Sequence, residues 1–367
     1  MIAKPNYIDT SSEIPSGGGS GEGDTYYITN EYSINTSPTI TTDTNGWLQA
    51  IDSETTSETG KTDMTGPIMS MLQDTGYCHL SEGIFYVSGN IVMPSYSKIE
   101  GCGFNTKIRL LQSTTAASTI VMKTHCSVEN LLIEGAPEDI TRSATIGGRN
   151  GIEWGVQETS LSGIISKCKI RRFDGAGILL QNTMTPTIRN TLISDCFIIN
   201  NNAGIFVKKD SEFHRISNCT ISANYYGYYN RGGNNNISNC GIDSNVVGIL
   251  IDSEEGSNNG HGTITGCSIN HSDSNTGYGL IIKDTGRMLV SNCNFYYSKI
   301  RLENTNGNIV SNCGFGQSAG WEIEDGACNI FNGCMVRSLQ DTPVTIINND
   351  ETKIINCFDR HNNQIII

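Results

Sequence analysis

The chain has 367 residues, a formal net charge of −13 and a hydrophobic content of 37%. An acidic surface repels the phosphates of nucleic acids and the head groups of anionic membranes, so the charge disfavours both as partners. No apolar run is long enough to span a bilayer and the N-terminal residues contain no signal-peptide core, so we expect synthesis in a reducing cytoplasm without membrane insertion.

The first part of the chain divides by composition. Residues 1–15 are too few to fold alone, and the Gly/Ser-rich stretch that follows them is typical of a flexible linker. We therefore interpret 1–23 as an attachment peptide with its linker and 24–98 as an N-terminal segment. Residues 99–367 then form one long repeat domain.

A helix is predicted within the N-terminal segment. Pro67 stands in a sequence typical of a helix start, Ile68, Met71 and Leu72 recur at helical spacing, and Gly76 is a typical helix end. This amphipathic helix would cap the repeat domain, since an uncovered sheet end invites aggregation.

A short pattern recurs through the repeat domain. It consists of an aliphatic residue, two small polar residues, a cysteine, any residue and an apolar residue, as in Ile216 to Ile221. Steps of 20 to 28 residues between its cysteines are typical of a β-solenoid, in which one repeat is one coil. The cysteines are Cys168, Cys196, Cys219, Cys240, Cys267, Cys293, Cys313, Cys334 and Cys357, with an upstream copy at Cys102.

A second fragment follows within each repeat. It is a glycine followed by aliphatic or aromatic residues, as in Gly204 to Val207. Such short runs, rich in β-branched residues, indicate strands. Corresponding residues of successive coils then lie about 4.8 Å apart, one above another.

Stacking would place the cysteines in one internal column of small apolar side chains. Their odd number, 13, and the absence of CxxC pairs argue against a disulfide framework or a metal site, so we expect no metal and no cofactor. Asparagines that precede the cysteines suit a left-handed turn and could bond from coil to coil. They are Asn218, Asn239, Asn292, Asn312 and Asn356.

The series between residues 64 and 110 resembles the opening of pectate-lyase-superfamily proteins: a capping helix, Gly83 to Gly89, Met93-Pro94, then Ile99 to Leu110. The repeats of 128–358 are similar to that superfamily's β-helix. The resemblance implies an all-β, right-handed, single-stranded parallel β-helix with an N-terminal capping helix.

With its linker and short head, the chain is most similar to phage tailspike and tail-fibre proteins. This resemblance implies a homotrimer on the virion tail whose N-terminus contacts other tail or baseplate proteins. It also implies binding, and in many members cleavage, of bacterial surface polysaccharide. The fold alone does not fix the chemistry.

Acidic residues occupy the turns after the second fragments. Stacking would bring carboxylates one or two coils apart to about 5–10 Å, a range that covers retaining and inverting glycosidases. The candidate acid/base residues are Asp210, Glu212, Asp252, Glu254 and Asp284. The alternative is a solvated acidic edge. Of the superfamily's hydrolase motifs only Gly260-His261-Gly262 is present.

Strand alternation predicts an outward column on the second fragments. Its members are Leu179, Phe206, Tyr229, Leu250 and Ile281, with Glu153 before them and Arg301 and Glu322 after them. An apolar stripe of this size marks an interface, either a trimer axis or a platform for sugar stacking. A register shift of one residue would exchange the two faces.

The longest insertion, residues 134–163, is expected to form a lip over one face, and we include its Trp154 among the contact residues. Three functions stay open. The first is a tail appendage that binds, and in an active form degrades, surface polysaccharide. The second is a free polysaccharide lyase or glycoside hydrolase, which the missing signal peptide and the incomplete motifs disfavour. The third is a structural tail protein without glycan contact.

Overall fold

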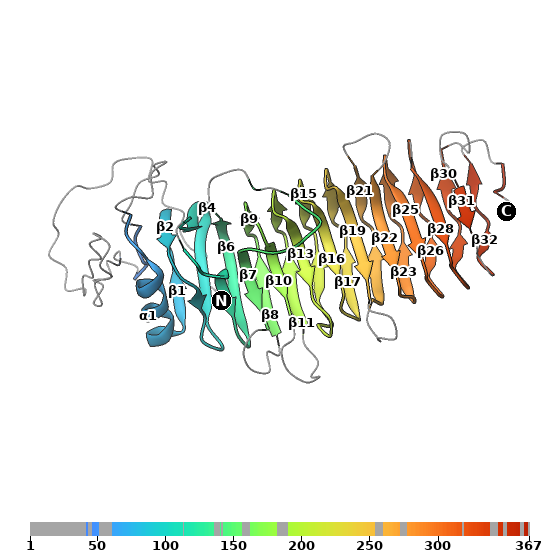
Figure 1. Ribbon diagram of the computed structural model, residues 1–367. Helices are drawn as coiled ribbons and strands as arrows, with labels where there is room; N and C mark the ends of the chain where they lie inside the picture. Colours follow the sequence, from blue (N-terminus) through green and yellow to red (C-terminus); the bar gives the residue numbers. More distant parts are fainter. Residues whose placement is uncertain are drawn as a thin grey trace, which may run out of the picture.

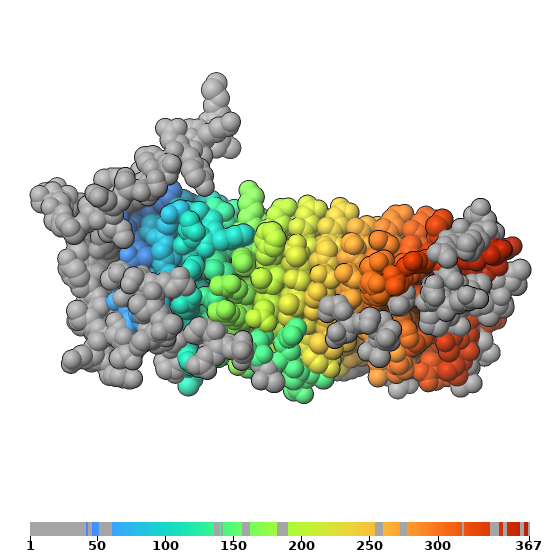
Figure 2. All heavy atoms as spheres, turned by 90° about the horizontal axis from the view of Figure 1, so that it is seen from above, coloured from blue at the N-terminus to red at the C-terminus, as the bar shows by residue number. Residues whose placement is uncertain are grey.

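The computed structural model describes residues 42, 46–50, 61–112, 114–135, 140, 142–155, 162–181, 190–253, 260–271, 277–317, 319–337, 344–347, 351–359 and 363–365. The strands lie side by side along a rod that runs from α1 at one end to β32 at the other (Figure 1). Seen from above, successive parts of the sequence form successive bands across the rod (Figure 2). No helix among the described residues is long and apolar enough to cross a bilayer.

Each coil contributes strands to three faces. Face 1 consists of β1 (Tyr77–His79), β8 (Ser162–Ser166), β11 (Asn190–Ser194), β14 (Arg215–Ser217), β17 (Asn235–Ser238), β20 (Gly262–Thr265), β23 (Met288–Ser291), β26 (Ile309–Ser311), β29 (Ile330–Asn332) and β32 (Lys353–Ile355). Face 2 consists of β2 (Gly83–Val87), β9 (Lys169–Arg171), β12 (Phe197–Ile199), β15 (Thr220–Ser222), β18 (Gly241–Asp243), β21 (Ser268–Asn270), β24 (Asn294–Tyr296), β27 (Gly314–Phe315), β30 (Met335–Val336) and β33 (Phe358–Asp359).

Two long strands, β4 (Lys98–Leu110) and β6 (Cys126–Glu134), cross from face 1 to face 2 and join them into one 22-stranded sheet. Face 3 is a separate 11-stranded sheet. It consists of β3 (Ile91–Val92), β5 (Ser118–Met122), β7 (Asn150–Trp154), β10 (Ala176–Leu180), β13 (Ala203–Val207), β16 (Tyr226–Asn230), β19 (Val247–Asp252), β22 (Tyr278–Lys283), β25 (Lys299–Glu303), β28 (Gly320–Glu324) and β31 (Val344–Ile347).

Strand pairing is parallel throughout these sheets, and it confirms the predicted parallel β-helix. On face 1, for example, Ile193 pairs with Ile216 and Ile216 with Ile237, so identical residues stack inside the rod. The boundary expected at residue 99 falls inside β4, and the parallel pairing of β2 with β4 extends the sheet further toward the N-terminus.

The cysteine column has the predicted arrangement. Cys219 lies between Cys196 and Cys240 in hydrogen-bonding range of both, and its Sγ donates to the carbonyl of Ser217 at 3.2 Å. The contact with Cys196, together with burial, raises the pKa of Cys219 to about 12. All 13 cysteines of the chain are free thiols.

Cys102 departs from the pattern. The pairing of β4 with β6 shifts between Glu100 and Gly103, and this irregularity leaves the Cys102 side chain half-buried. In the next coil Leu131 occupies the cysteine position of the motif, and its side chain is fully buried. Cys102 is therefore the one member of the sequence pattern that lies outside the internal column.

Asparagines serve two different turns. Those before the cysteines have the predicted left-handed backbone, with φ of 55° at Asn218 and 53° at Asn239. The coil-to-coil ladder, however, lies in the turn before face 3. There the Asn201 N–H donates to Asn224 Oδ1 at 2.8 Å and the Asn224 N–H donates to Asn245 Oδ1 at 2.9 Å. All three side chains are buried, where their amides satisfy backbone groups that water cannot reach.

The predicted helix is present as α1 (Thr65–Thr75). Gly76 has φ of 73°, and its N–H donates to the carbonyl of Leu72, as in a left-handed helix end. Ile68 and Leu72 are buried in the same apolar cluster as the first coils. The helix therefore closes this end of the core, as expected.

Glycines at the starts of the face 3 strands allow the coils to stack closely. A Cβ on Gly227 would lie 2.5 Å from the carbonyl oxygen of Gly248 in the next coil. A Cβ added to Gly241, on face 2, would have no atom within 4 Å.

We therefore predict that Gly227→Ala lowers the free energy of unfolding by about 1–3 kcal/mol, because the coils must separate to admit the methyl group. Gly241→Ala is the matched control and should be neutral or stabilising by about 0.4–1 kcal/mol. Urea denaturation of both variants measures the difference, and equal stability of the two would contradict the stacking argument.

Candidate functional site

The outer column of face 3 has the predicted register. Leu179, Phe206, Tyr229, Leu250 and Ile281 pair in this order across five strands. Their predecessors in the chain are buried: Ile178, Ile205, Tyr228, Ile249 and Leu280. Glu153 precedes these residues in the column, and Arg301 and Glu322 follow them, as expected.

A second outward column lies at the starts of the same strands, and alternation alone does not predict it. Ala176 belongs to the same outer cluster as Leu179, three residues later in the chain. A Cβ on the intervening Gly177 would meet the side chain of Ile198, which is buried in the core. Gly177 and the buried Ile178 therefore both face inward, and the backbone is irregular at this glycine. The column reads Ala176, Ala203, Tyr226, Val247 and Tyr278. The recurring glycine was the available signal for this irregularity.

The two columns together form an aromatic platform, which we define as Phe206, Tyr226 and Tyr229. Phe206 stacks on Tyr229 with ring centroids 4.9 Å apart, and Tyr226 lies 5.1 Å from Tyr229. All three rings are partly exposed. Partly exposed, mutually fixed rings offer apolar area at little entropic cost, a property that suits ligand contact.

A polar edge follows the platform along the strands. Tyr229 Oη donates to Asp252 at 2.8 Å, and the Arg231 guanidinium lies 3.8 Å from the same carboxylate and 6.0 Å from the centre of the Tyr229 ring. Burial, and then the hydrogen bond to Asp252, raises the pKa of Tyr229 well above its usual value. The Tyr229 hydroxyl thus stays protonated at neutral pH.

The insertion covers one end of the outer column. Its Ile146 packs on Ala176 and Leu179, which is only 6% exposed. Tyr226 Oη donates to the carbonyl of Ala144 at 3.4 Å, and the Ser143 N–H donates to Asn202 Oδ1 at 2.8 Å. The described part of the insertion is therefore the expected lip, and it borders the aromatic platform.

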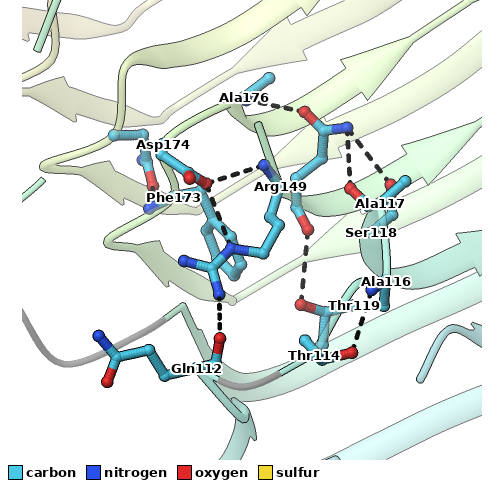
Figure 3. A network of polar contacts seen from close by, with 12 residues as sticks. Gln112, Thr114, Ala116, Ala117, Ser118, Thr119, Arg149, Phe173, Asp174 and Ala176 are labelled. Atoms are coloured by element: carbon cyan, nitrogen blue, oxygen red, sulfur yellow. Dashed lines mark hydrogen bonds and ion pairs between the residues drawn. The ribbon is translucent and has the colours of Figure 1, made fainter. Parts of the chain in front are cut away.

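Arg149 and Asn150 of the insertion are held by polar contacts. The Arg149 backbone N–H donates to Asp174 Oδ1 at 2.8 Å, and the Arg149 side chain contacts the same oxygen and the carbonyl of Gln112 (Figure 3). The next residue, Asn150, accepts from the Ala176 N–H at 2.8 Å. These bonds tie the lip to the face 3 strands that carry the outer column.

Trp154 is a correction to the sequence prediction. Its side chain is 0% exposed and belongs to the central core, so it cannot contact a ligand or a second chain. The reason is strand alternation. Glu153 pairs with outward Leu179, and Trp154 pairs with inward Leu180.

The predicted carboxylates follow the ends of face 3 strands, and each has its own surroundings. Asp252 ends β19 and contacts Tyr229, Glu212 accepts from Asn234 at 3.2 Å, and Asp284 accepts from Asn304 at 2.9 Å. Asp210 is exposed, with a left-handed backbone of φ 62°. Glu254 lies outside the described residues.

Two candidate residues converge across a glycine. A Cβ on Gly233 would lie 2.9 Å from Glu212 Oε1 and 2.8 Å from His261 Cε1. These residues come from the turns of three successive coils, and the missing side chain of the middle one leaves room for the carboxylate and the imidazole to approach. A carboxylate beside an imidazole can hold and transfer a proton.

No group of three or more His, Cys, Asp or Glu side chains within the described ranges is arranged to hold a metal ion. The far end of the outer column is instead a cluster of ion pairs. Glu322 accepts from Lys299 and from Tyr278 Oη, both at 2.8 Å, and Arg301 pairs with Glu324 at 2.9 Å. Burial acts to raise the pKa of Glu322, but these hydrogen bonds hold it below its usual value.

This pKa shift predicts a pH dependence for Glu322→Gln. A carboxyl with a lowered pKa stabilises the fold above its unfolded pKa and loses that contribution as the pH falls through the folded pKa. The variant should therefore lower the urea midpoint at about pH 7 and approach the parent protein at about pH 3. An equal difference at both pH values would contradict the ion-pair account.

A model of the right-handed β-helix region matches residues 150–272 and 203–359. No curated protein sequence matches the chain.

Solved structures share its fold at low identity. The A-module of the mannuronan C-5 epimerase AlgE6 from Azotobacter vinelandii has 13% identity and a TM-score of 0.55 over 81% of this chain and 95% of its own. The tailspike of Escherichia coli bacteriophage HK620, solved with a pentasaccharide, has 12% identity and a TM-score of 0.55 over 91% of this chain and 79% of its own. The tailspike gp49 of Acinetobacter baumannii bacteriophage Fri1, a capsular polysaccharide depolymerase, has 12% identity and a TM-score of 0.51 over 81% of this chain and 59% of its own.

Proposed function

Because the chain belongs to the right-handed β-helix family, we propose that it is a polysaccharide-binding protein that acts as a phage tail appendage. The fold shared with two phage tailspikes, one solved with a pentasaccharide and one a capsular polysaccharide depolymerase, supports this class of ligand. The linker-like composition of residues 16–23 supports a tethered attachment head.

The aromatic platform is the observation that carries the proposal. Sugar rings present flat C–H faces, and exposed aromatic rings bind such faces through apolar contact. Arg231 and Asp252 lie directly beside Tyr229 and supply a cationic donor and an anionic acceptor for sugar hydroxyls. Lys208, which is exposed and donates to Gln181 at 2.6 Å, adds a second cationic donor beside face 3.

The platform fits a glycan better than a trimer axis. The lip buries Leu179 at one end of the outer column, and ion pairs around Arg301 and Glu322 end it at the other. The apolar stretch between them is short, and its rings border hydrogen-bonding groups. These properties resemble a ligand site more than an apolar chain interface.

We predict that Tyr226→Ala and Tyr229→Ala each weaken polysaccharide binding at least about tenfold, which corresponds to about 1.4 kcal/mol. An array of bacterial surface polysaccharides would first identify the ligand, and biolayer interferometry would then compare the variants. Tyr296→Ala, which removes a 41% exposed ring from face 2, is the matched control and should bind normally. If the array yields no ligand, or if the control loses as much affinity as the platform variants, the structural tail protein becomes the better account.

A homotrimer on the virion tail, with contacts to other tail or baseplate proteins through residues 1–23, belongs to the same proposal. Residues 1–23 lie outside the described residues. Light scattering after size-exclusion chromatography should give three times the mass of the chain. A monomer that depolymerises polysaccharide would instead favour a free lyase or hydrolase.

Cleavage of the bound glycan is the second candidate function, and the convergence of Glu212 and His261 at Gly233 favours it. Their turns follow face 3 strands, so a chain bound on the platform would pass beside them. Here Glu212 would donate a proton to the leaving oxygen, and His261 would take a proton from the attacking water.

The test is release of reducing ends from the polysaccharide that the array identifies. Glu212→Gln and His261→Asn should each lower the rate about a hundredfold or more while binding persists. Asp195→Asn, which changes an exposed carboxylate between β11 and β12, away from face 3, should retain the rate. New absorbance from unsaturated sugars would indicate a lyase, and activity that survives both variants would exclude this pair.

A further inference from the structure

A second chemical site lies near the capped end of the rod, on the edge of face 1. Cys102 is half-buried beside β1, and its Sγ lies 4.0 Å from His79 Nε2 and donates to the carbonyl of Leu80 at 3.4 Å. The same sheet irregularity that removes Cys102 from the internal column turns its thiol toward this histidine. A thiol beside an imidazole is the arrangement of a nucleophile with its base.

A chain of hydrogen bonds sets the tautomer of that histidine. Tyr77 Oη donates its only proton to Glu100 Oε2 at 2.6 Å. The Tyr77 oxygen must therefore act as acceptor toward His79 Nδ1, which lies 3.1 Å away and donates to it. With its proton on Nδ1, the imidazole presents the lone pair of Nε2 to Cys102. The groups are thus ordered as thiol, base and orienting acid, as in activated nucleophiles on unrelated folds.

The surroundings hold this arrangement in place. The Trp47 ring stacks on His79 with centroids 3.6 Å apart and planes 9° from parallel. Lys98 Nζ pairs with Glu100 at 3.1 Å and with Glu129 at 3.2 Å. Glu100 lies 2.6 Å from the Tyr77 oxygen and would stabilise the imidazolium that forms when His79 takes a proton. Among the described residues, these contacts bring the ammonium of Lys98 and the carboxylates of Glu100 and Glu129 to the site.

We propose that Cys102 is a nucleophilic thiol that His79 activates and that undergoes exchange with small disulfides. In this step the Cys102 proton passes to His79 Nε2, and the thiolate attacks one sulfur of the disulfide. A new S–S bond forms to Cys102, the original S–S bond breaks, and the departing thiolate takes up a proton. No other oxidant is needed, because the small disulfide is itself reduced.

The other cysteines provide the contrast. Eleven of the 13 are buried, and Cys78 beside this site has its pKa raised by burial to about 12. Cys328 is exposed, but its thiol donates to Glu351 at 3.1 Å, and this carboxylate raises its pKa. The proposal thus assigns the fastest reaction to the half-buried Cys102 and not to the more accessible Cys328.

The test is the reaction of the native full-length chain with the aromatic disulfide probe dithionitrobenzoate at neutral pH. We expect one fast thiol per chain. Cys102→Ser should abolish the fast phase, and Cys328→Ser should leave it unchanged. Incubation with glutathione disulfide, followed by peptide mass spectrometry, should place the mixed disulfide on Cys102.

Two further variants separate activation from mere exposure. His79→Gln should slow the fast phase at least about tenfold, and Tyr77→Phe, which keeps the ring but removes the hydroxyl, should slow it and move its pH profile toward that of an ordinary thiol, about pH 8.5. Circular dichroism and the thiol count in denaturant check that each variant is folded and complete. A fast phase that belongs to Cys328, or one that both variants leave unchanged, would overturn the proposal.

Discussion

In-register stacking of parallel coils is the constraint on which the rest of this structure depends. Each residue lies directly above its counterpart in the previous coil, so a residue type that suits one position is repeated as a column. Inside the rod, this repetition gives the columns of isoleucine and cysteine side chains that fill the core. Adjacent cysteines stay free because stacked Cβ atoms about 4.8 Å apart are too distant for an unstrained disulfide.

The same stacking builds surface chemistry from residues far apart in the chain. Phe206 meets Tyr226 and Tyr229 because two adjacent coils share one register, and Glu212 and His261 both approach Gly233 because that glycine in the coil between them has no side chain. The lip at Ile146 adds a wall where the repeat is interrupted. A regular scaffold thus carries its proposed functions at the places where the pattern varies.

The sequence predicted the elements that repetition specifies. The coil fold, the cysteine column, the outer column of face 3 and α1 with its end at Gly76 are all confirmed. The failures lie where an insertion interrupts the repeat or where the backbone departs from regular geometry. Trp154 is expected among the contact residues because the insertion hides its strand register, and the outward position of Tyr226 depends on an irregularity at the following glycine.

Cys102 shows the same limit, because a shift in pairing within β4 moves it out of the column that its motif predicts. The contacts of Glu212 with Asn234 and of Asp252 with Tyr229 depend on side-chain directions that spacing does not specify. Position within the repeat is therefore readable from the sequence, whereas the partners that each surface residue contacts are not.

A crystal structure of the chain with an oligosaccharide from its cognate surface polysaccharide would test the account most directly. We expect sugar rings packed on Tyr226 and Tyr229, with the glycan running across successive coils of face 3 and its hydroxyls bonded to Arg231 or Asp252. A glycan seated on face 1 or face 2, with the aromatic platform uncovered, would contradict it.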